Sequence, residues 1–79
     1  MRYYPRLRDL REDKDLVQKN LAEILNTSQK QYSRWETGTR EIPSHHVITL
    51  AKFYKTSTDY ILGLTNDPTP IDILAKKIK

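Results

Sequence analysis

The chain has 79 residues, 37% hydrophobic and 30% charged, with a net charge of +4, which indicates one small domain. It has no cysteine, which excludes disulfides, thiolate catalysis and cysteine-based zinc sites. It also has no secretion signal and no apolar run near the roughly 18 residues of a membrane span, so we expect a cytoplasmic protein. The basic balance favours a nucleic-acid partner without establishing one.

Caps and apolar spacings predict short helices at residues 5–13, 18–25, 28–37, 44–54 and 57–63. The first begins with Pro5, whose missing N–H costs nothing in a first helical turn. Apolar residues three or four positions apart predict the faces that form the core. These residues are Leu7, Leu10, Leu21, Ala22, Leu25, Tyr32, Trp35, Val47, Leu50, Ala51, Tyr54, Ile61 and Leu62.

The third helix has clear boundaries. Ser28 and Gln31 form an S-x-x-Q capping box, in which the serine oxygen accepts from the Gln31 amide and the glutamine reaches back to the Ser28 amide. Gly38 supplies the stop. Only Asn26 and Thr27 separate this helix from the previous one, and asparagine tolerates the left-handed conformation of a tight turn. Two helices joined so closely predict a helix-turn-helix unit.

The outer face of the third helix is polar. Tyr32 and Trp35 bury one face, which leaves the opposite face to Gln29, Lys30, Ser33 and Arg34. A recognition helix contacts base edges from such a position, because glutamine pairs bidentately with adenine, and arginine or lysine with guanine. The alternative interpretation is an ordinary solvated helix face.

Residues 6–63 resemble the phage-repressor and Cro helix-turn-helix family (Xre-like). The resemblance rests on RLRDLRED, VQKNLAEIL, NTSQKQYSRWETG and TREIPSHHVITLAKFYKTSTDYILG, in family order and spacing. It implies an all-α, five-helix, lambda-repressor-like DNA-binding domain that binds a two-fold operator as a homodimer. We therefore expect a sequence-specific regulator of transcription that binds double-stranded DNA, of the repressor kind, associated with the nucleoid through DNA.

The resemblance also implies roles for single residues. Base reading falls to Gln29, Lys30 and Arg34, with Ser33 on the same face; for Gln31, capping is favoured over base reading. Phosphate binding falls to Gln18, Ser28, Thr37 and Arg40. Arg11 and Glu36 match a salt bridge between the first and third helices, while Ala22, Tyr32 and Trp35 match core positions.

Several positions depart from the family pattern. Asp15, Asn26 and Lys55 replace glycines at helix ends, and lysine is the least comfortable of the three at a positive φ. Val17 stands where a capping threonine or serine is common, which loses about 1 kcal/mol. Tyr32 replaces a small branched aliphatic residue. These departures predict modest stability and leave the DNA contacts intact.

Other features favour structural interpretations. The N-terminal arginines, Arg6 and Arg8 among them, are predicted to be surface charge that adds to the field on DNA. Trp35 and the tyrosines are expected in the core, and not as a base-stacking platform. His45 and His46 point about 100° apart on a helix and lack partners at zinc spacing, so no metal is expected. Without a nucleophile–base pair, a phosphate loop or a metal motif, we expect neither enzymatic activity nor a cofactor.

The C-terminal segment is treated separately. Residues 1–66 form the predicted DNA-binding domain, and residues 67–79 a linker followed by a short helix. Thr69 caps this helix, Pro70 opens it, and its apolar stripe is Ile71, Leu74, Ala75 and Ile78. The helix either closes the domain's own core or forms the dimer interface; the second is favoured because five helices already complete the family domain.

Two other functions remain open. The first is an antitoxin or adaptor whose helix-turn-helix body serves a protein partner such as a toxin. The second is a basic nucleic-acid binder without sequence preference; the uncharged Gln29 among the predicted readers argues against it, because non-specific binding rests on phosphate charge. A chain of 79 residues leaves no room for a ligand-sensing domain, so we expect a signal through a partner, through proteolysis or by displacement from DNA.

Overall fold

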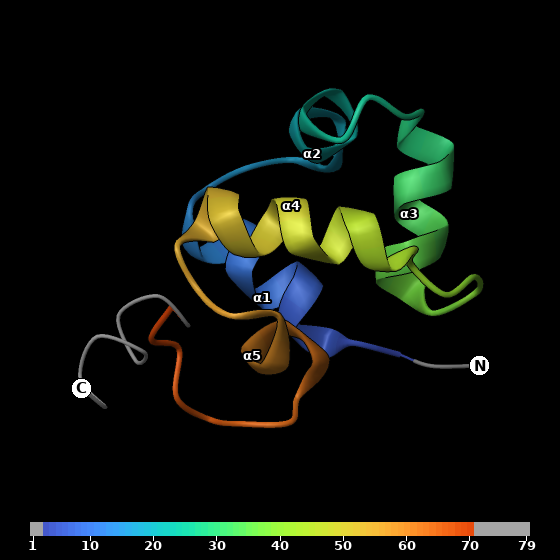
Figure 1. The fold of residues 1–79 in the computed structure, drawn as a ribbon. Coiled ribbons are helices and arrows are strands. Elements are labelled where there is room, and N and C mark those ends of the chain that lie inside the picture. Colours follow the sequence, from blue (N-terminus) through green and yellow to red (C-terminus); the bar gives the residue numbers. More distant parts are fainter. Residues whose placement is uncertain (1–2, 71–79) are drawn as a thin grey trace.

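The computed structural model describes residues 3–70, which form five helices and no strand (Figure 1). The helices are α1 (Pro5–Asp13), α2 (Gln18–Ile24), α3 (Gln29–Thr37), α4 (Ser44–Tyr54) and α5 (Thr58–Leu62). The predicted all-α, five-helix fold is therefore confirmed. The helix limits agree with the predicted ones once the capping residues Leu25, Ser28, Ser57 and Gly63 are set aside.

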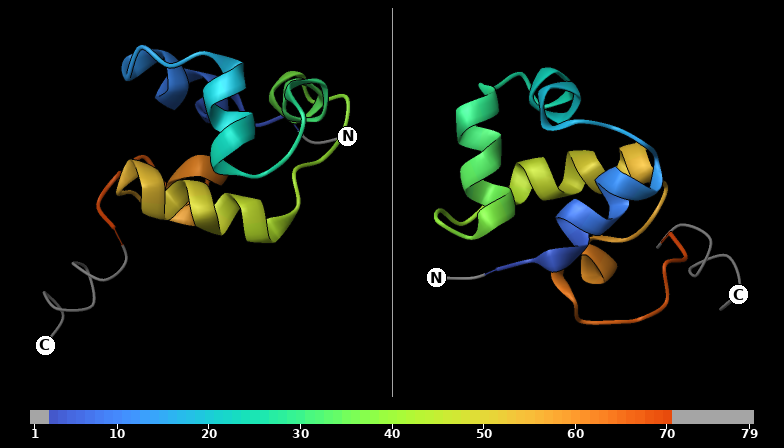
Figure 2. Two further views of the ribbon diagram at one scale, coloured as in Figure 1. Left: turned by 90° about the horizontal axis from the view of Figure 1, so that it is seen from above. Right: turned by 180° about the vertical axis from the view of Figure 1, so that it is seen from behind.

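The helices surround α4, which crosses the centre of Figure 1. α2 and α3 pack on each other, α1 packs on α3 and α5, and α5 also packs on α4. The right-hand view of Figure 2, seen from behind, shows α1 in front of α4, so α1 lies on the side of α4 that is turned away from the viewer in Figure 1. α3 therefore has α1 and α2 as neighbours on its inner side, and its outer side faces away from the body.

All five helices contribute to one hydrophobic core. Leu7, Leu21, Tyr32 and Leu50 are fully buried, and Ile61 is 1% exposed. The core was predicted correctly except at Leu10 and Leu62, which are only partly buried, and at Ile42, which the loop before α4 adds. Its buried members are Leu7, Leu21, Ala22, Leu25, Tyr32, Trp35, Ile42, Val47, Leu50, Ala51, Tyr54 and Ile61.

Two tyrosines fill the centre of this core as nearly apolar rings. Tyr32 meets Trp35 edge to face, with ring centroids 6.5 Å apart. The buried Tyr32 and Tyr54 hydroxyls have no hydrogen-bond partner between residues 3 and 70. Burial, with a smaller effect of the Glu36 charge, raises the pKa of Tyr32 and raises that of Tyr54 to about 12. Both rings therefore stay neutral. Tyr3 corrects the prediction that the tyrosines lie in the core, since it is 57% exposed, whereas Tyr4 and Tyr60 are partly buried.

Two predicted helix starts behave differently from expectation. Val17 gives α2 no side-chain cap, as predicted, but Asn20 Oδ1 accepts from the Val17 amide over 2.9 Å and replaces half of a capping box. At α3 the Ser28 hydroxyl oxygen accepts from the Gln31 amide over 3.1 Å. The predicted return bond from the Gln31 side chain is absent from this part of the structure. That bond requires more side-chain torsions to be ordered than the bond from the shorter Asn20.

Arg6 corrects the prediction that the N-terminal arginines are surface charge. Its guanidinium donates to the carbonyl oxygens of Tyr60 and Thr65 and, over 2.6 Å, to Asn66 Oδ1. It also lies 4.0 Å from the Tyr60 ring centroid. These contacts fasten the segment after α5 to α1. Arg8 is exposed as predicted, and pairs with Glu12 over 3.1 Å.

The segment after α5 also contacts the end of α4. The Thr56 hydroxyl donates to the carbonyl oxygen of Pro68 over 2.7 Å. The body thus holds the chain as far as Pro68. The predicted C-terminal helix lies, from Ile71 on, outside the described residues.

Three residues other than glycine adopt the left-handed conformation at the predicted helix ends. Asp15, Asn26 and Lys55 have φ values of 56°, 55° and 56°. Asparagine and aspartate tolerate this conformation because their short polar side chains bond locally, whereas for other residues it costs roughly 1–2 kcal/mol. Lys55 is therefore the most strained of the three positions.

We predict that Lys55→Gly stabilises the protein by about 0.5–1 kcal/mol, because relief of the strain exceeds the entropy that glycine adds to the unfolded chain. The matched control is Asn26→Gly, whose gain should be smaller. The measurement is the free energy of unfolding from urea titration followed by circular dichroism. Equal gains for both variants would contradict the assignment of strain to Lys55.

Candidate nucleic-acid interface

The turn between α2 and α3 brings the two helices together. Three successive amides cap the end of α2: Leu25 donates to Leu21, Asn26 to Glu23 and Thr27 to Ala22, over 2.9–3.1 Å. The left-handed Asn26 then reverses the chain into Ser28, the N-cap of α3. Ala22 is 3% exposed, and its small side chain permits this close packing of α2 against α3.

The predicted base-reading residues lie together on the outer face of α3. At 100° per residue, positions 29, 30, 33 and 34 span an arc of about 140°, opposite Tyr32 and Trp35. Gln29 and Lys30 are exposed, while Ser33 and Arg34 are half-buried. Their side chains make no hydrogen bond or ion pair with any residue from 3 to 70. α3 thus presents donors and acceptors that the fold itself does not use.

Three of the predicted phosphate-binding residues lie at the two ends of α3. The exposed Ser28 uses its oxygen as an acceptor for the cap, which leaves the hydroxyl proton to be donated. At the other end, the Thr37 hydroxyl donates to the Arg34 carbonyl over 3.3 Å and lies 3.0 Å from the Thr39 hydroxyl. The amide of the exposed Arg40 donates to the same carbonyl over 3.1 Å, so the loop folds back beside Arg34.

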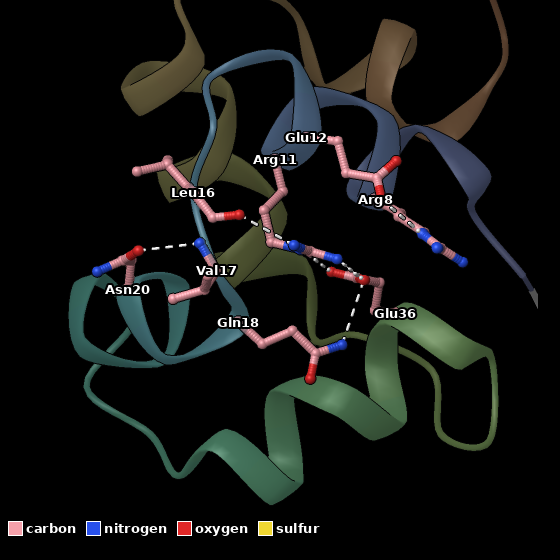
Figure 3. A network of polar contacts seen from close by, with 8 residues as sticks. All are labelled: Arg8, Arg11, Glu12, Leu16, Val17, Gln18, Asn20 and Glu36. Carbon is pink, nitrogen blue, oxygen red and sulfur yellow. Dashed lines mark hydrogen bonds and ion pairs between the residues drawn. The ribbon is translucent and has the colours of Figure 1, made fainter.

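Gln18, the fourth predicted phosphate-binding residue, is bonded inward. It is the first residue of α2 and is half-buried. Its side-chain nitrogen Nε2 lies 3.2 Å from Glu36 Oε1 (Figure 3). This contact was not expected, because no helical or strand period relates two residues that are 18 positions apart in the sequence.

Glu36 is the acceptor at the centre of this network. Its carboxylate is 3% exposed and accepts two bonds from the Arg11 guanidinium, at 2.9 Å from Nε and 2.7 Å from Nη2. The same guanidinium donates from Nη1 to the Leu16 carbonyl over 2.9 Å. Arg11 and Glu36 therefore form the salt bridge that the resemblance implies. With Gln18, they connect α1, α2 and α3 (Figure 3).

The network keeps Glu36 ionised. Burial favours the neutral acid, but the hydrogen bonds from Arg11 and Gln18, together with the Arg11 charge, outweigh burial and lower the pKa of the Glu36 carboxyl below 4.5. The unfolded chain therefore binds a proton here more readily than the folded protein does. The stability that Glu36 contributes is present above about pH 4.3, the unfolded value, and is lost as the pH falls through the folded pKa.

We predict that Glu36→Gln lowers the free energy of unfolding at pH 7 by about 1.5–3 kcal/mol, the range for hydrogen bonds to a charged group. The difference from the unmodified protein should shrink as the pH falls below about 4.3, the unfolded value, and through the lowered folded pKa at which Glu36 is protonated. Urea titrations at several pH values measure this. The control Glu23→Gln, which changes an exposed carboxyl without a bond in the described structure, should leave the profile unchanged. A difference that is equal at every pH would contradict a role for the Glu36 charge.

The histidine pair lies beside the end of α3. The His46 ring packs on Trp35 with centroids 4.9 Å apart, and the His45 ring lies 4.0 Å from His46, closer than their angular separation suggested. Burial and the neighbouring His45 lower the pKa of His46. Within residues 3–70 there is no group of three or more histidine, cysteine or acidic side chains placed to hold a metal ion.

A groove of about 570 Å³ lies on another part of the surface. Its lining includes Tyr4, Ile42, Val47, Ile48 and Leu62, and no residue of α2 or α3. Ile48 is 48% exposed at its rim. The groove is therefore separate from the α2–α3 unit. None of the helices between residues 3 and 70 has the length and apolar character needed to cross a bilayer.

Comparison with known proteins also identifies a helix-turn-helix domain. Residues 7–61 match the helix-turn-helix family. YobD of Bacillus subtilis (strain 168), named as an uncharacterized HTH-type transcriptional regulator, is 40% identical over 68 residues, which are 86% of this chain and 61% of YobD. ImmR of the same organism, named as an HTH-type transcriptional regulator, is 34% identical over 58 residues, which are 73% of this chain and 46% of ImmR.

Both relatives are longer than the stretch that they share with this chain, which spans about half to three fifths of their length. No solved structure gives a significant match.

Proposed function

Since the chain belongs to the Xre-like helix-turn-helix family of transcriptional regulators, we propose that it binds double-stranded DNA sequence-specifically with α3 in the major groove. The observation that carries this proposal is the outer face of α3. Gln29, Lys30, Ser33 and Arg34 share one arc, and none of these side chains bonds to the described part of the fold. In contrast, the three arginines of α1 all donate hydrogen bonds within the domain: Arg6, Arg8 and Arg11.

Each group on this face has a partner in DNA. Gln29 matches the donor and acceptor edge of adenine, Arg34 and Lys30 match guanine, and the Ser33 hydroxyl can bond to either kind of edge. Ser28, Thr37 and Arg40 lie at the two ends of α3, where a helix seated in the groove meets the phosphate backbones on either side. We assign base reading to the first set and phosphate binding to the second, together with Gln18.

We further propose that the protein binds as a dimer on a two-fold operator and acts as a repressor. Two copies would place their α3 helices in successive major grooves about 34 Å apart. A helix buried in the groove excludes other proteins from the same bases, so a site that overlaps a promoter would block transcription.

The experiment that tests the proposal is selection of the protein on random duplex DNA at near-physiological salt. An enriched inverted repeat with half-sites about 10 base pairs apart would support a dimeric sequence reader and define the operator. Binding that depends on salt but enriches no sequence would overturn it. That result would favour the antitoxin or adaptor function, in which DNA binding requires a partner protein.

We predict that Arg34→Ala weakens binding to the selected operator by about 1–3 kcal/mol and relaxes the preference at one base position. The matched control is Arg8→Ala, which removes the same charge from an arginine paired with Glu12. Both variants are measured by titration of operator and random duplexes. An equal loss on both duplexes for Arg34→Ala would exclude base reading by this residue.

Arg40→Ala should behave differently, because its proposed contact is a phosphate. Binding should weaken by a similar factor on operator and random DNA, and the slope of log affinity against log salt should become shallower by about one unit. The measurement is the Kd at several salt concentrations. An unchanged slope would mean that Arg40 neutralises no phosphate.

A further inference from the structure

We propose that Glu36, although buried, is a positioning residue for DNA binding: its carboxylate orients the Gln18 side-chain amide so that the second N–H of that amide meets a DNA phosphate. This inference rests on the proposed phosphate contact of Gln18. It adds an interior residue, and with it Arg11, to the determinants of DNA affinity.

Glu36 itself is not available to DNA. The residue is 4% exposed, and both carboxylate oxygens accept bonds from within the domain: Oε2 from Arg11, and Oε1 from Arg11 and Gln18. A free carboxylate near a phosphate would also repel it. Any effect of Glu36 on DNA affinity must therefore act through a side chain that bonds to it.

The chemistry of the two groups fixes which way the Gln18 amide points. An amide has two N–H donors on nitrogen and one acceptor oxygen, whereas an ionised carboxylate only accepts. The Gln18 nitrogen must therefore face Glu36, at 3.2 Å. One N–H is used in this bond, and the other diverges from it on the same nitrogen. The carbonyl oxygen, which would repel a phosphate, is turned away from Glu36 (Figure 3).

A glutamine held in this way binds an anion better than a free one. A solvated amide samples many rotamers, half of which present the oxygen where the phosphate needs a donor. Ordering a long polar side chain on binding weakens the affinity roughly two- to tenfold. In this protein the bond to Glu36 orders the amide before DNA arrives, and Arg11 holds Glu36 in place with a two-point contact of 2.9 and 2.7 Å.

The test is a mutant cycle measured as the Kd for the selected operator. Gln18→Ala is introduced into the unmodified protein and into a background in which Arg11→Met and Glu36→Met replace the ion pair together. Replacing both partners with apolar side chains avoids an unpaired buried charge and often preserves folding. Thermal unfolding confirms that each variant is folded at the temperature of the titration.

We expect Gln18→Ala to weaken binding about tenfold in the unmodified protein, the loss of one hydrogen bond to a charged group, and less than about fivefold in the Met background, where binding must also order the side chain. The matched control is Gln31→Ala, which changes a half-buried glutamine of α3 that has no bond to Glu36 and should have the same effect in both backgrounds. An equal loss for Gln18→Ala in both backgrounds would overturn the positioning role.

A different result would show that Gln18 does not contact a phosphate at all. If Gln18→Ala leaves the affinity of the unmodified protein unchanged, the inference fails, while the Arg34→Ala result still decides whether α3 reads bases.

A second measurement covers the case in which the Met background does not fold. In the NMR spectrum of the unmodified protein, one side-chain amide proton of Gln18 should shift on operator binding and the other should not; shifts of both or of neither would refute the inference.

Discussion

The bidentate contact between Arg11 and Glu36 is the interaction on which the interface depends. It joins α1 to α3 across the domain, and through Gln18 it also reaches the first residue of α2. The recognition unit is a short pair of helices, and helices of this length have little stability of their own in water. Their mutual orientation must come from tertiary contacts. Within residues 3–70 the Arg11–Glu36 ion pair joins α1 to α3, and the uncharged Gln18 amide extends the network to α2.

Much of this architecture could be predicted because its signals are local. Ser28, Gly38 and Ser57 mark helix ends within one turn of themselves, and apolar residues three or four apart identify the core faces. The left-handed positions at Asp15, Asn26 and Lys55 were also predicted, from a family pattern that places glycine there. In each case the residue and its structural consequence lie within a few positions of each other.

What could not be predicted depends on residues that are distant in sequence. Arg6 meets Asn66, and Gln18 meets Glu36; neither pair follows a helical or strand period. Local reasoning therefore classed Arg6 with exposed Arg8, although the first lies against the ring and carbonyl of Tyr60 and the second against a neighbour on its own helix. The face of α3 that we propose to read bases has the opposite character: its composition is local, but its proposed partner lies outside the protein.

The fastening of Arg6 to the segment after α5 has a consequence for the order of events during synthesis. The chain emerges N-terminus first at about 5–20 residues per second, so α1 leaves the ribosome several seconds before Thr65 and Asn66. Until then the Arg6 guanidinium has no partner, and α1 lacks α5 to pack on. The contacts between α1 and the segment after α5 therefore form only after α2 and α3 have emerged.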